Sequence, residues 1–301
     1  MKKWYLPVTL ALLTAVLGAC GNEESTTSNS TTKVVEEQRI GSLSIHLTND
    51  LIALDITPVG SVVGGSLGDF LPQAAPYLTK ATKYGPVKDV DMESLLSSEP
   101  DVIVADEEFA AANLEHYKKI APVQLYNLDE GTWRDHLTLL GEKFKKEESA
   151  KQFIADYEKK TEEVKSLLAK QYGEGATAMA IRVTDKELRV FSTARPMGPI
   201  LFKDLNLEPA TGITEMGTEE PYQVISKEVI GDYDADIIFV VVNSNEEAEK
   251  VYKELAKSSI WKSLKAVQKG QIFVVSDQPW LDYSALGNSM AMDQLYDQLK
   301  K

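Results

Sequence analysis

The sequence predicts an α/β fold with two Rossmann-like lobes joined by a single long α-helix. Short apolar runs alternate with helical patterns in residues 39–141 and again in residues 173–301, which is typical of βα units around a mostly parallel sheet. An uninterrupted helical pattern separates these two regions, and one sequence pattern occurs in both. Two related lobes with a helical connection account for all three observations.

The first residues predict a signal peptide over residues 1–19. Lys2 and Lys3 precede an apolar run from Leu6 to Leu17, and the letters LGAC follow, ending at Cys20. A membrane span takes about 20 apolar residues, so this run is too short to be one. LGAC resembles the bacterial lipobox, in which the cysteine is diacylated. The alternative is an ordinary signal peptide with an incidental cysteine.

Cys20 is the only cysteine, so no intramolecular disulfide can form. We expect it to carry a lipid anchor that holds the protein on the extracytoplasmic face of the cell membrane. Residues 20–38 are rich in Ser, Thr, Asn and Glu and predict a flexible tether.

The overall composition excludes some partners. Hydrophobic residues make up 43% of the chain and charged residues 26%, as in soluble globular proteins. The net charge of −14 argues against nucleic acid and against binding an anionic membrane through a basic face.

The predicted strands are the short apolar runs of each half. In the first half they are Ser42–His46, Pro58–Val63, Val102–Ala105 and Val123–Leu125. In the second half they are Ala178–Val183, Glu187–Phe191, Ile237–Val242 and Gln271–Val275. Because open α/β sheets bind ligands beyond the carboxyl ends of their strands, the segments that follow these strands are the candidate binding segments.

Apolar residues recur at helical spacing from Arg134 to about Lys170, with no Pro and no Gly after Gly141. We place the linking helix at residues 142–172. A helix from Glu147 to Lys170 would be about 35 Å long at 1.5 Å per residue, enough to span two lobes.

One pattern occurs in both halves. Glu93 and Glu228 each lie three residues after a β-branched residue and eight residues before an aspartate that opens an apolar strand. Asp91 and Ser226 precede them as expected helix N-caps, and a carboxylate in a first helical turn is favoured by the helix dipole. The pattern indicates two related lobes, although any two βα units can share it.

These motifs together resemble a known family. The pieces are VDMESLLSSEPDVIV, YQVISKEVIGDYDADIIFV, the joining segment WRDHLTLLGEKFKKEESAKQFIADYEKKTEEVKSLL, and the closing segment AVQKGQIFVVSDQPWLDYSALG. With the lipobox, they are similar to the iron-siderophore-binding lipoproteins of Gram-positive ABC importers, a group that also includes cobalamin and haem receptors. The resemblance covers roughly residues 39–300.

The resemblance implies a monomeric receptor with its ligand in the cleft between the lobes, and only small closure about the helix. It also implies that one glutamate per lobe pairs with arginines of the two permease subunits. Glu93 and Glu228 are the matching positions. The alternative is that both are solvated first-turn residues.

The resemblance and the candidate segments indicate seven ligand-binding residues. Arg182 ends an apolar strand, where a cation is costly unless it is paired or exposed to a cleft, and its planar fork of donors suits ligand oxygens. The family uses aromatic residues in the loop that holds Trp280 and Tyr283. The remaining candidates are Arg195, Tyr84, Met197 and Tyr222. Arg189 is expected to be solvated or structural, and Trp133 and Trp261 are expected to be packing residues.

Arginine is scarce in the first half, with none between Arg39 and Arg134. Few cations favour a ligand of low charge, such as a ferric hydroxamate, unless Lys83 points inward. The alternatives are receptors for catecholate or citrate siderophores, haem or cobalamin. A haem receptor would need an axial pair, for which Met197 and His46 are the only candidates.

The chain shows no feature that would support catalysis. It lacks a nucleophile elbow and a Cys–His pairing, and its three histidines have no metal-ligand spacing. We therefore expect a binding protein with no cofactor or resident metal, not an enzyme.

Overall fold

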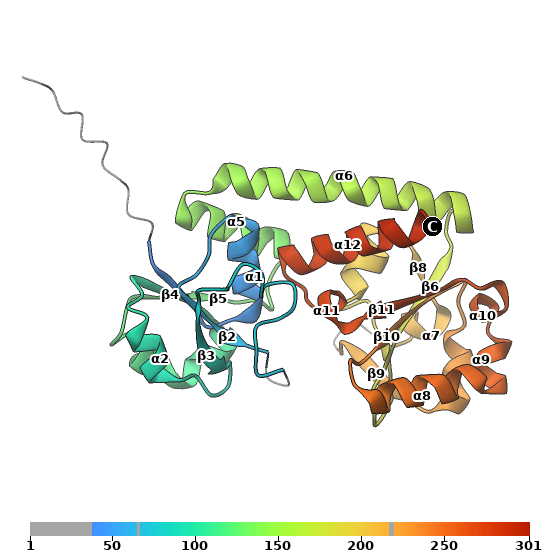
Figure 1. Cartoon of the computed structure of the whole chain (residues 1–301). Coiled ribbons are helices and arrows are strands. Elements are labelled where there is room, and N and C mark those ends of the chain that lie inside the picture. The colour runs from blue at the N-terminus through green and yellow to red at the C-terminus, as the bar shows by residue number, and fades with distance from the viewer. Residues whose placement is uncertain (1–37, 65–66, 217–219) are drawn as a thin grey trace, which may run out of the picture. The chain divides into compact units, whose positions relative to one another are not determined.

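The computed structural model describes residues 38–64, 67–216 and 220–301, which form two α/β lobes connected by a long helix (Figure 1). The predicted signal peptide, the lipidation site Cys20 and residues 20–37 of the predicted tether lie outside the described residues. Within those three ranges, no helix has the length and apolarity needed to cross a membrane.

The first lobe is built on a parallel five-stranded sheet, counting the described residues. Its strand order is β3-β2-β1-β4-β5, and every pair is parallel. The strands are β1 (Ile40–Ser42), β2 (Gly60–Val63), β3 (Thr82–Pro86), β4 (Val102–Asp106) and β5 (Val123–Tyr126). The chain reverses its winding between β1 and β4, so ligands are expected beyond the carboxyl ends of these strands.

Helices and one 3-10 turn lie between these strands, and α5 follows the last of them. They are α1 (Ile45–Ala53), α2 (Met92–Ser97), α3 (Glu107–Ala110), η1 (Ala111–Asn113), α4 (Leu114–Tyr117) and α5 (Trp133–Phe144). As predicted, Asp91 caps α2, since its side chain accepts from the backbone N–H groups of Glu93 and Ser94.

The predicted strand Ser42–His46 is wrong beyond Ser42. Ser44 is the N-cap of α1, and its hydroxyl accepts from the backbone N–H of Leu47. Residues 44–46 therefore form the cap and the first turn of a helix, although the sequence had placed them in a strand. As a result His46 lies in the first turn of α1 and not at the end of a strand.

The second lobe holds a mixed sheet with the order β11-β10-β6-β7-β9, and β8 pairs with β6. β6 is parallel to β10 and β8, β10 is parallel to β11, and β7 is antiparallel to both β6 and β9. The strands are β6 (Thr177–Val183), β7 (Leu188–Phe191), β8 (Glu208–Pro209), β9 (Tyr222–Ile225), β10 (Ile237–Val242) and β11 (Ile272–Ser276).

The helical elements of this lobe surround that sheet. They are η2 (Pro199–Asp204), α7 (Thr211–Thr214), η3 (Lys227–Tyr233), α8 (Glu246–Lys257), α9 (Ser259–Ser263), α10 (Lys265–Lys269), α11 (Asp277–Trp280) and α12 (Ala285–Leu299). The predicted cap at Ser226 is only partly right, because η3 is a 3-10 helix and the Ser226 side chain does not cap its backbone.

The connection between the lobes is α6 (Glu147–Tyr172), whose 26 residues span about 39 Å. The helical pattern that begins at Arg134 belongs to two helices, because α5 ends where Lys145 adopts the left-handed conformation with φ of 57°. Gly141 allows α5 and α6 to approach closely, since a Cβ there would lie 2.9 Å from the Cβ of Ala150.

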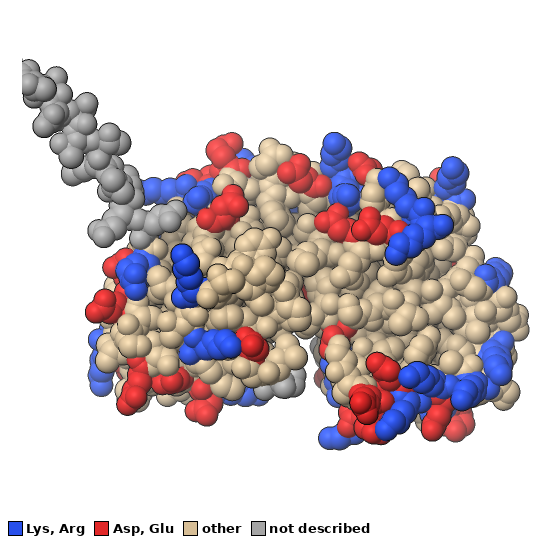
Figure 2. Space-filling view, viewed as in Figure 1, with Lys and Arg blue, Asp and Glu red and all other residues tan. Residues whose placement is uncertain are grey.

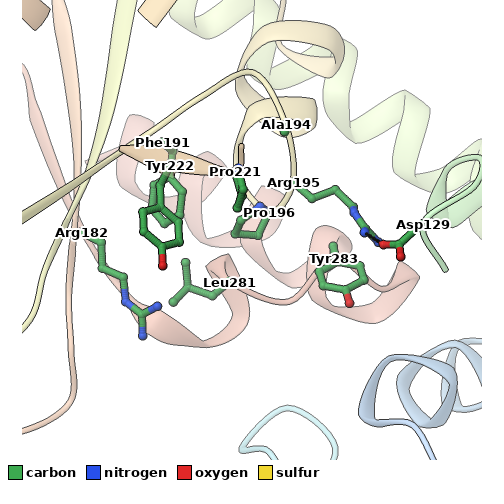
Figure 3. A pocket seen from close by; sticks show the side chains of 10 residues that line it. All are labelled: Asp129, Arg182, Phe191, Ala194, Arg195, Pro196, Pro221, Tyr222, Leu281 and Tyr283. Carbon is green, nitrogen blue, oxygen red and sulfur yellow. Dashed lines mark hydrogen bonds and ion pairs between the residues drawn. The ribbon is translucent and has the colours of Figure 1, made fainter. Parts of the chain in front are cut away.

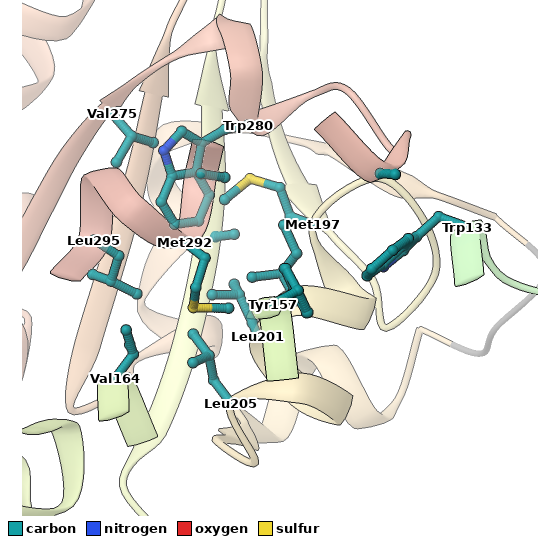
Figure 4. Close-up of a cluster of buried hydrophobic side chains, with 14 of the residues drawn as sticks. Trp133, Tyr157, Val164, Met197, Leu201, Leu205, Val275, Trp280, Met292 and Leu295 are labelled. Carbon is teal, nitrogen blue, oxygen red and sulfur yellow. The ribbon is translucent and has the colours of Figure 1, made fainter. Parts of the chain in front are cut away.

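The largest hydrophobic cluster is continuous through both lobes. It contains Leu47 of α1, Val164 of α6 and Phe239 of β10. The C-terminal helix α12 packs against both α1 and α6, and Figure 4 shows Met292 of α12 in one cluster with Trp280 and Val164. The chain crosses between the lobes once, through α6, but the lobes also share this apolar packing.

Candidate functional site

A pocket of about 480 Å³ lies where loops of the second lobe meet the first lobe. Arg182 comes from β6, Phe191 from the end of β7, and Tyr222 from the start of β9. Figure 3 shows Arg182 and Tyr222 on one side and Arg195 and Tyr283 on the other, with Leu281 between them. The remaining lining residues are Asp129, Ala194, Pro196 and Pro221.

Arg182, the first candidate from the sequence, lies in the pocket wall as a half-buried side chain. Its Nε donates to Asn243 Oδ1 at 2.8 Å. Unlike Arg189 and Arg195, it forms no ion pair with a carboxylate in the described part of the chain. Burial, and then the charge of Arg189, lower the pKa of the Arg182 guanidinium. A desolvated cation of this kind favours an anionic or strongly polar oxygen partner.

Arg195 reaches across to the first lobe. Its guanidinium donates to the backbone carbonyl of Leu128 and to the Asp129 carboxylate. It also lies over the ring of Tyr283, with its Cζ 4.3 Å from the ring centroid. Arg195 therefore lines the pocket with its charge already balanced by Asp129.

Tyr283 and Tyr222 supply aromatic faces and hydroxyl groups. Burial raises the pKa of Tyr283 to about 12, so its phenol is neutral and can donate. The guanidinium of Arg189 lies 4.4 Å from the Tyr222 ring centroid and pairs with Glu187. This pairing agrees with the structural role expected for Arg189. Arg189 covers one face of the Tyr222 ring, so the other face can meet a ligand, and both tyrosines add a hydroxyl group to the pocket lining.

Trp280 and Met197 do not line the pocket, contrary to the prediction. Both side chains are fully buried in the main core, where the Trp280 ring lies 5.6 Å from that of Phe239 (Figure 4). The Trp280 Nε1–H donates to Gln294 Oε1 at 3.0 Å. Because Met197 is buried in this core, it also cannot serve with His46 as an axial pair for haem.

Tyr84 is a third correction. It is fully buried on β3, where its hydroxyl bonds with Ser98 at 2.7 Å. Its ring occupies the space beside Gly60, where a Cβ would lie 2.2 Å from the Tyr84 Cζ. Lys83 points elsewhere and pairs with Asp69 at 2.9 Å. The first lobe therefore contributes no lysine to this pocket.

Sequence reasoning missed Asp129. It lies three residues after β5, and its only signal was this place shortly after a predicted strand, in the letters YNLDEG. Phe191, Ala194, Pro196 and Leu281 lie in segments that the strand-end argument had marked, but none was singled out. Trp133 and Trp261 are buried packing residues, as predicted.

The residues of the repeated pattern are on the surface. Glu93 is exposed in the first turn of α2, and Glu228 is exposed in the first turn of η3. A hydrogen bond from the Ser226 side chain lowers the pKa of the Glu228 carboxyl, so it carries its charge at neutral pH. Figure 2 shows acidic and basic side chains interspersed on one face, with a notch between the lobes.

This fold and pocket define a solute-binding receptor: two α/β lobes joined by a helix, with an aromatic and cationic pocket where they meet. Residues 43–279 match the model of the periplasmic binding protein family. The chain belongs to this family, whose members are binding proteins and not enzymes.

Known relatives agree with the resemblance found in the sequence. The iron-uptake system-binding protein of Bacillus subtilis is 27% identical, over 93% of this chain and 92% of its own. The iron(3+)-hydroxamate-binding protein YxeB of the same species is 29% identical, over 100% of this chain and 98% of its own. The solved structure of Staphylococcus aureus SirA complexed with staphyloferrin B has a TM-score of 0.76 at 22% identity, over 87% of this chain and 93% of that one.

Proposed function

We propose that this protein captures a ferric hydroxamate siderophore outside the cytoplasm and delivers it to an ABC importer. The observation that carries the proposal is the pocket, in which a half-buried Arg182, with no carboxylate partner among the described residues, faces neutral aromatic and aliphatic groups. The guanidinium suits the oxygens around the metal, and the aromatic faces suit the organic backbone of the ligand.

The charge of the pocket favours a ligand with little net charge. Arg182 and Arg195 contribute two positive charges and Asp129 one negative charge, so the lining carries a formal charge of +1 (2 − 1). Three hydroxamate anions neutralise Fe(III), which matches this small charge. Citrate and catecholate complexes are strongly anionic and would need more cations. YxeB is named for iron(3+)-hydroxamate, which supports the choice.

A titration of intrinsic tryptophan fluorescence tests the proposal. We expect ferrioxamine B and ferrichrome to quench the emission at nanomolar concentrations, and ferric citrate and a ferric catecholate to bind at least about tenfold more weakly. The same protein is titrated with haem and with cobalamin. Tight binding of haem, cobalamin or only the anionic complexes would overturn the hydroxamate proposal.

Glu93 and Glu228 are proposed to dock the receptor on the permease through salt bridges, one from each lobe. Both are exposed first-turn carboxylates outside the pocket. The double substitution Glu93→Ala with Glu228→Ala should leave siderophore affinity unchanged and reduce uptake in cells by at least about tenfold, because buried interfacial charge pairs are costly to break.

The matched control is Glu147→Ala with Glu246→Ala. These two glutamates are also exposed and also lie in first helical turns, at the starts of α6 and α8. Uptake should stay at the level of the unchanged protein. Equal uptake by both double variants would rule out the docking role.

The remaining parts of the proposal concern location. We propose that the protein acts as a monomer and that a diacylated Cys20 holds it at the extracytoplasmic face of the membrane. The LGAC letters support this, and two acyl chains give stable anchoring. Metabolic labelling with a fatty acid should mark the protein and not its Cys20→Ser variant.

A further inference from the structure

A buried carboxylate next to the pocket connects the two lobes. Asp282, which is 1% exposed, belongs to the loop that leads into α12. Its carboxylate accepts from His46 Nδ1 at 3.0 Å, Asn49 Nδ2 at 2.5 Å and Gln73 Nε2 at 2.9 Å. All three donors belong to the first lobe, whereas Asp282 belongs to the second. A charge so deeply buried is stable only while these donors surround it.

The second lobe completes this arrangement. The backbone N–H and the hydroxyl of Ser284 both donate to Asp282, each at 3.0 Å, at the start of α12. Gly287 leaves room for the carboxylate, since a Cβ there would lie 2.5 Å from Asp282 Oδ2. Burial raises the pKa of Asp282, but the interactions with His46 and the hydrogen bonds from Gln73 and Ser284 together outweigh burial and lower the pKa. Asp282 is therefore ionised at neutral pH.

A second contact runs beside the first. Asp50 of α1 accepts from the backbone N–H of Ala285 at 2.7 Å, and Gln73 donates to Gln278 at 2.8 Å. Burial raises the pKa of Asp50 well above its usual value, and the nearby charge of Asp282 raises it further. Together these buried contacts of Asp282 and Asp50 form a polar seam between the two lobes.

The seam touches the pocket through Tyr283, the residue directly after Asp282. The His46 ring stacks on the Tyr283 ring with 3.6 Å between centroids and an interplanar angle of 26°. The Arg195 guanidinium lies 4.3 Å from the same centroid. The His46 ring and the Arg195 guanidinium would overlap if both lay on one face of the Tyr283 ring at these distances. They therefore lie on opposite faces of that ring. His46 itself does not line the pocket.

We infer that His46 and Asp282 form a positioning unit, which holds the Tyr283 ring in the pocket wall and makes its position depend on contact between the lobes. Asp282 fixes the loop, and His46, oriented by its bond to Asp282, fixes the ring face. Because His46 belongs to α1 of the first lobe, Tyr283 has this support only where the two lobes are in contact. The inference rests on the proposed siderophore pocket and assigns residues that act on the ligand only through Tyr283.

A double-mutant cycle between positions 46 and 283 tests the inference. His46→Ala should weaken binding of ferrioxamine B, measured by fluorescence, about tenfold, which is within the range for coupled neighbours. In a Tyr283→Ala background the same change at position 46 should alter the affinity less than about twofold. An equal loss in both backgrounds, or no loss in either, would overturn the inference.

Two further substitutions separate the contributions of His46. His46→Phe keeps a ring against Tyr283 but cannot bond to Asp282, whereas His46→Asn keeps a donor near Asp282 but loses the ring. Each should lose part of the affinity if both contacts position Tyr283. Full affinity in both variants would contradict the role. His46→Phe also replaces His46→Ala in the cycle if the alanine variant does not fold.

Hydrogen exchange of the ligand-free protein gives a readout that does not depend on the siderophore. Amides of residues 281–288 should exchange several-fold faster in His46→Phe than in the unchanged chain, because the loop loses its first-lobe anchor. If the unchanged chain binds no ferric siderophore, the proposed function fails while this measurement still tests the seam. Unchanged exchange would show that His46 does not hold the loop.

Discussion

Replacing Arg182 by alanine should weaken binding of a ferric hydroxamate about a hundredfold, which corresponds to about 3 kcal/mol. The side chain is half-buried, donates its Nε–H to Asn243, and has no carboxylate partner among the described residues. Its remaining donors are therefore available for the oxygens that surround the iron. Fluorescence titration with ferrioxamine B gives the ratio of affinities directly.

Two companion variants make this result specific. Arg182→Lys keeps the charge but loses the planar fork of donors. Its affinity for the siderophore should therefore lie between that of the unchanged protein and that of Arg182→Ala. Lys83→Ala removes an exposed first-lobe cation that pairs with Asp69 outside the pocket, so it should bind as the unchanged protein does. A loss below about threefold for Arg182→Ala would show that this guanidinium does not contact the ligand.

The fold followed from the sequence because its signals are local. Long apolar runs such as Ile237–Val242 became buried central strands with the bounds that were predicted. Three strands were missed. β8 has only two residues, and β3 and β9 are edge strands with polar, partly exposed residues, of which β3 ends at a proline. An edge strand buries little, so its sequence does not show the apolar pattern on which the prediction relied.

The site was predicted only in part because the direction of a side chain is not a local property. Trp280 and Tyr283 lie three residues apart in the chain, yet the first is in the core and the second in the pocket. Arg182 was identifiable because a cation at the end of an apolar strand needs an explanation. Asp129 was not, because its role depends on a contact with Arg195, 66 residues away in the chain.

The position of His46 illustrates the same limit. Because Ser44 caps α1, His46 lies in the first turn of that helix. In this position it contacts Asp282, which is 236 residues away in the chain. No pattern in either segment indicates this pair. The seam between the lobes is thus visible only in three dimensions, although each of its residues is ordinary in the sequence.

Replacing Trp280 by alanine should lower the free energy of unfolding by about 3–5 kcal/mol, because the change leaves a large cavity in the main core. The Trp280 ring is fully buried against Phe239, and its Nε1–H donates to Gln294 Oε1. In the alanine variant Gln294 Oε1 would lose this donor. Trp280→Phe should cost less, since it keeps most of the apolar volume. Urea denaturation followed by circular dichroism measures both changes.

The matched control is Trp261→Ala, which empties a comparable buried position in the other hydrophobic cluster of the second lobe. It should destabilise the protein to a similar degree. Tyr283→Ala should show the opposite behaviour, with a small effect on unfolding and a clear loss of siderophore affinity. If Trp280→Phe kept full stability but lost affinity, Trp280 would belong to the pocket wall, as its place in the loop first indicated. The burial of its ring predicts the reverse, because a side chain that packs only against the protein interior acts on stability before it acts on binding.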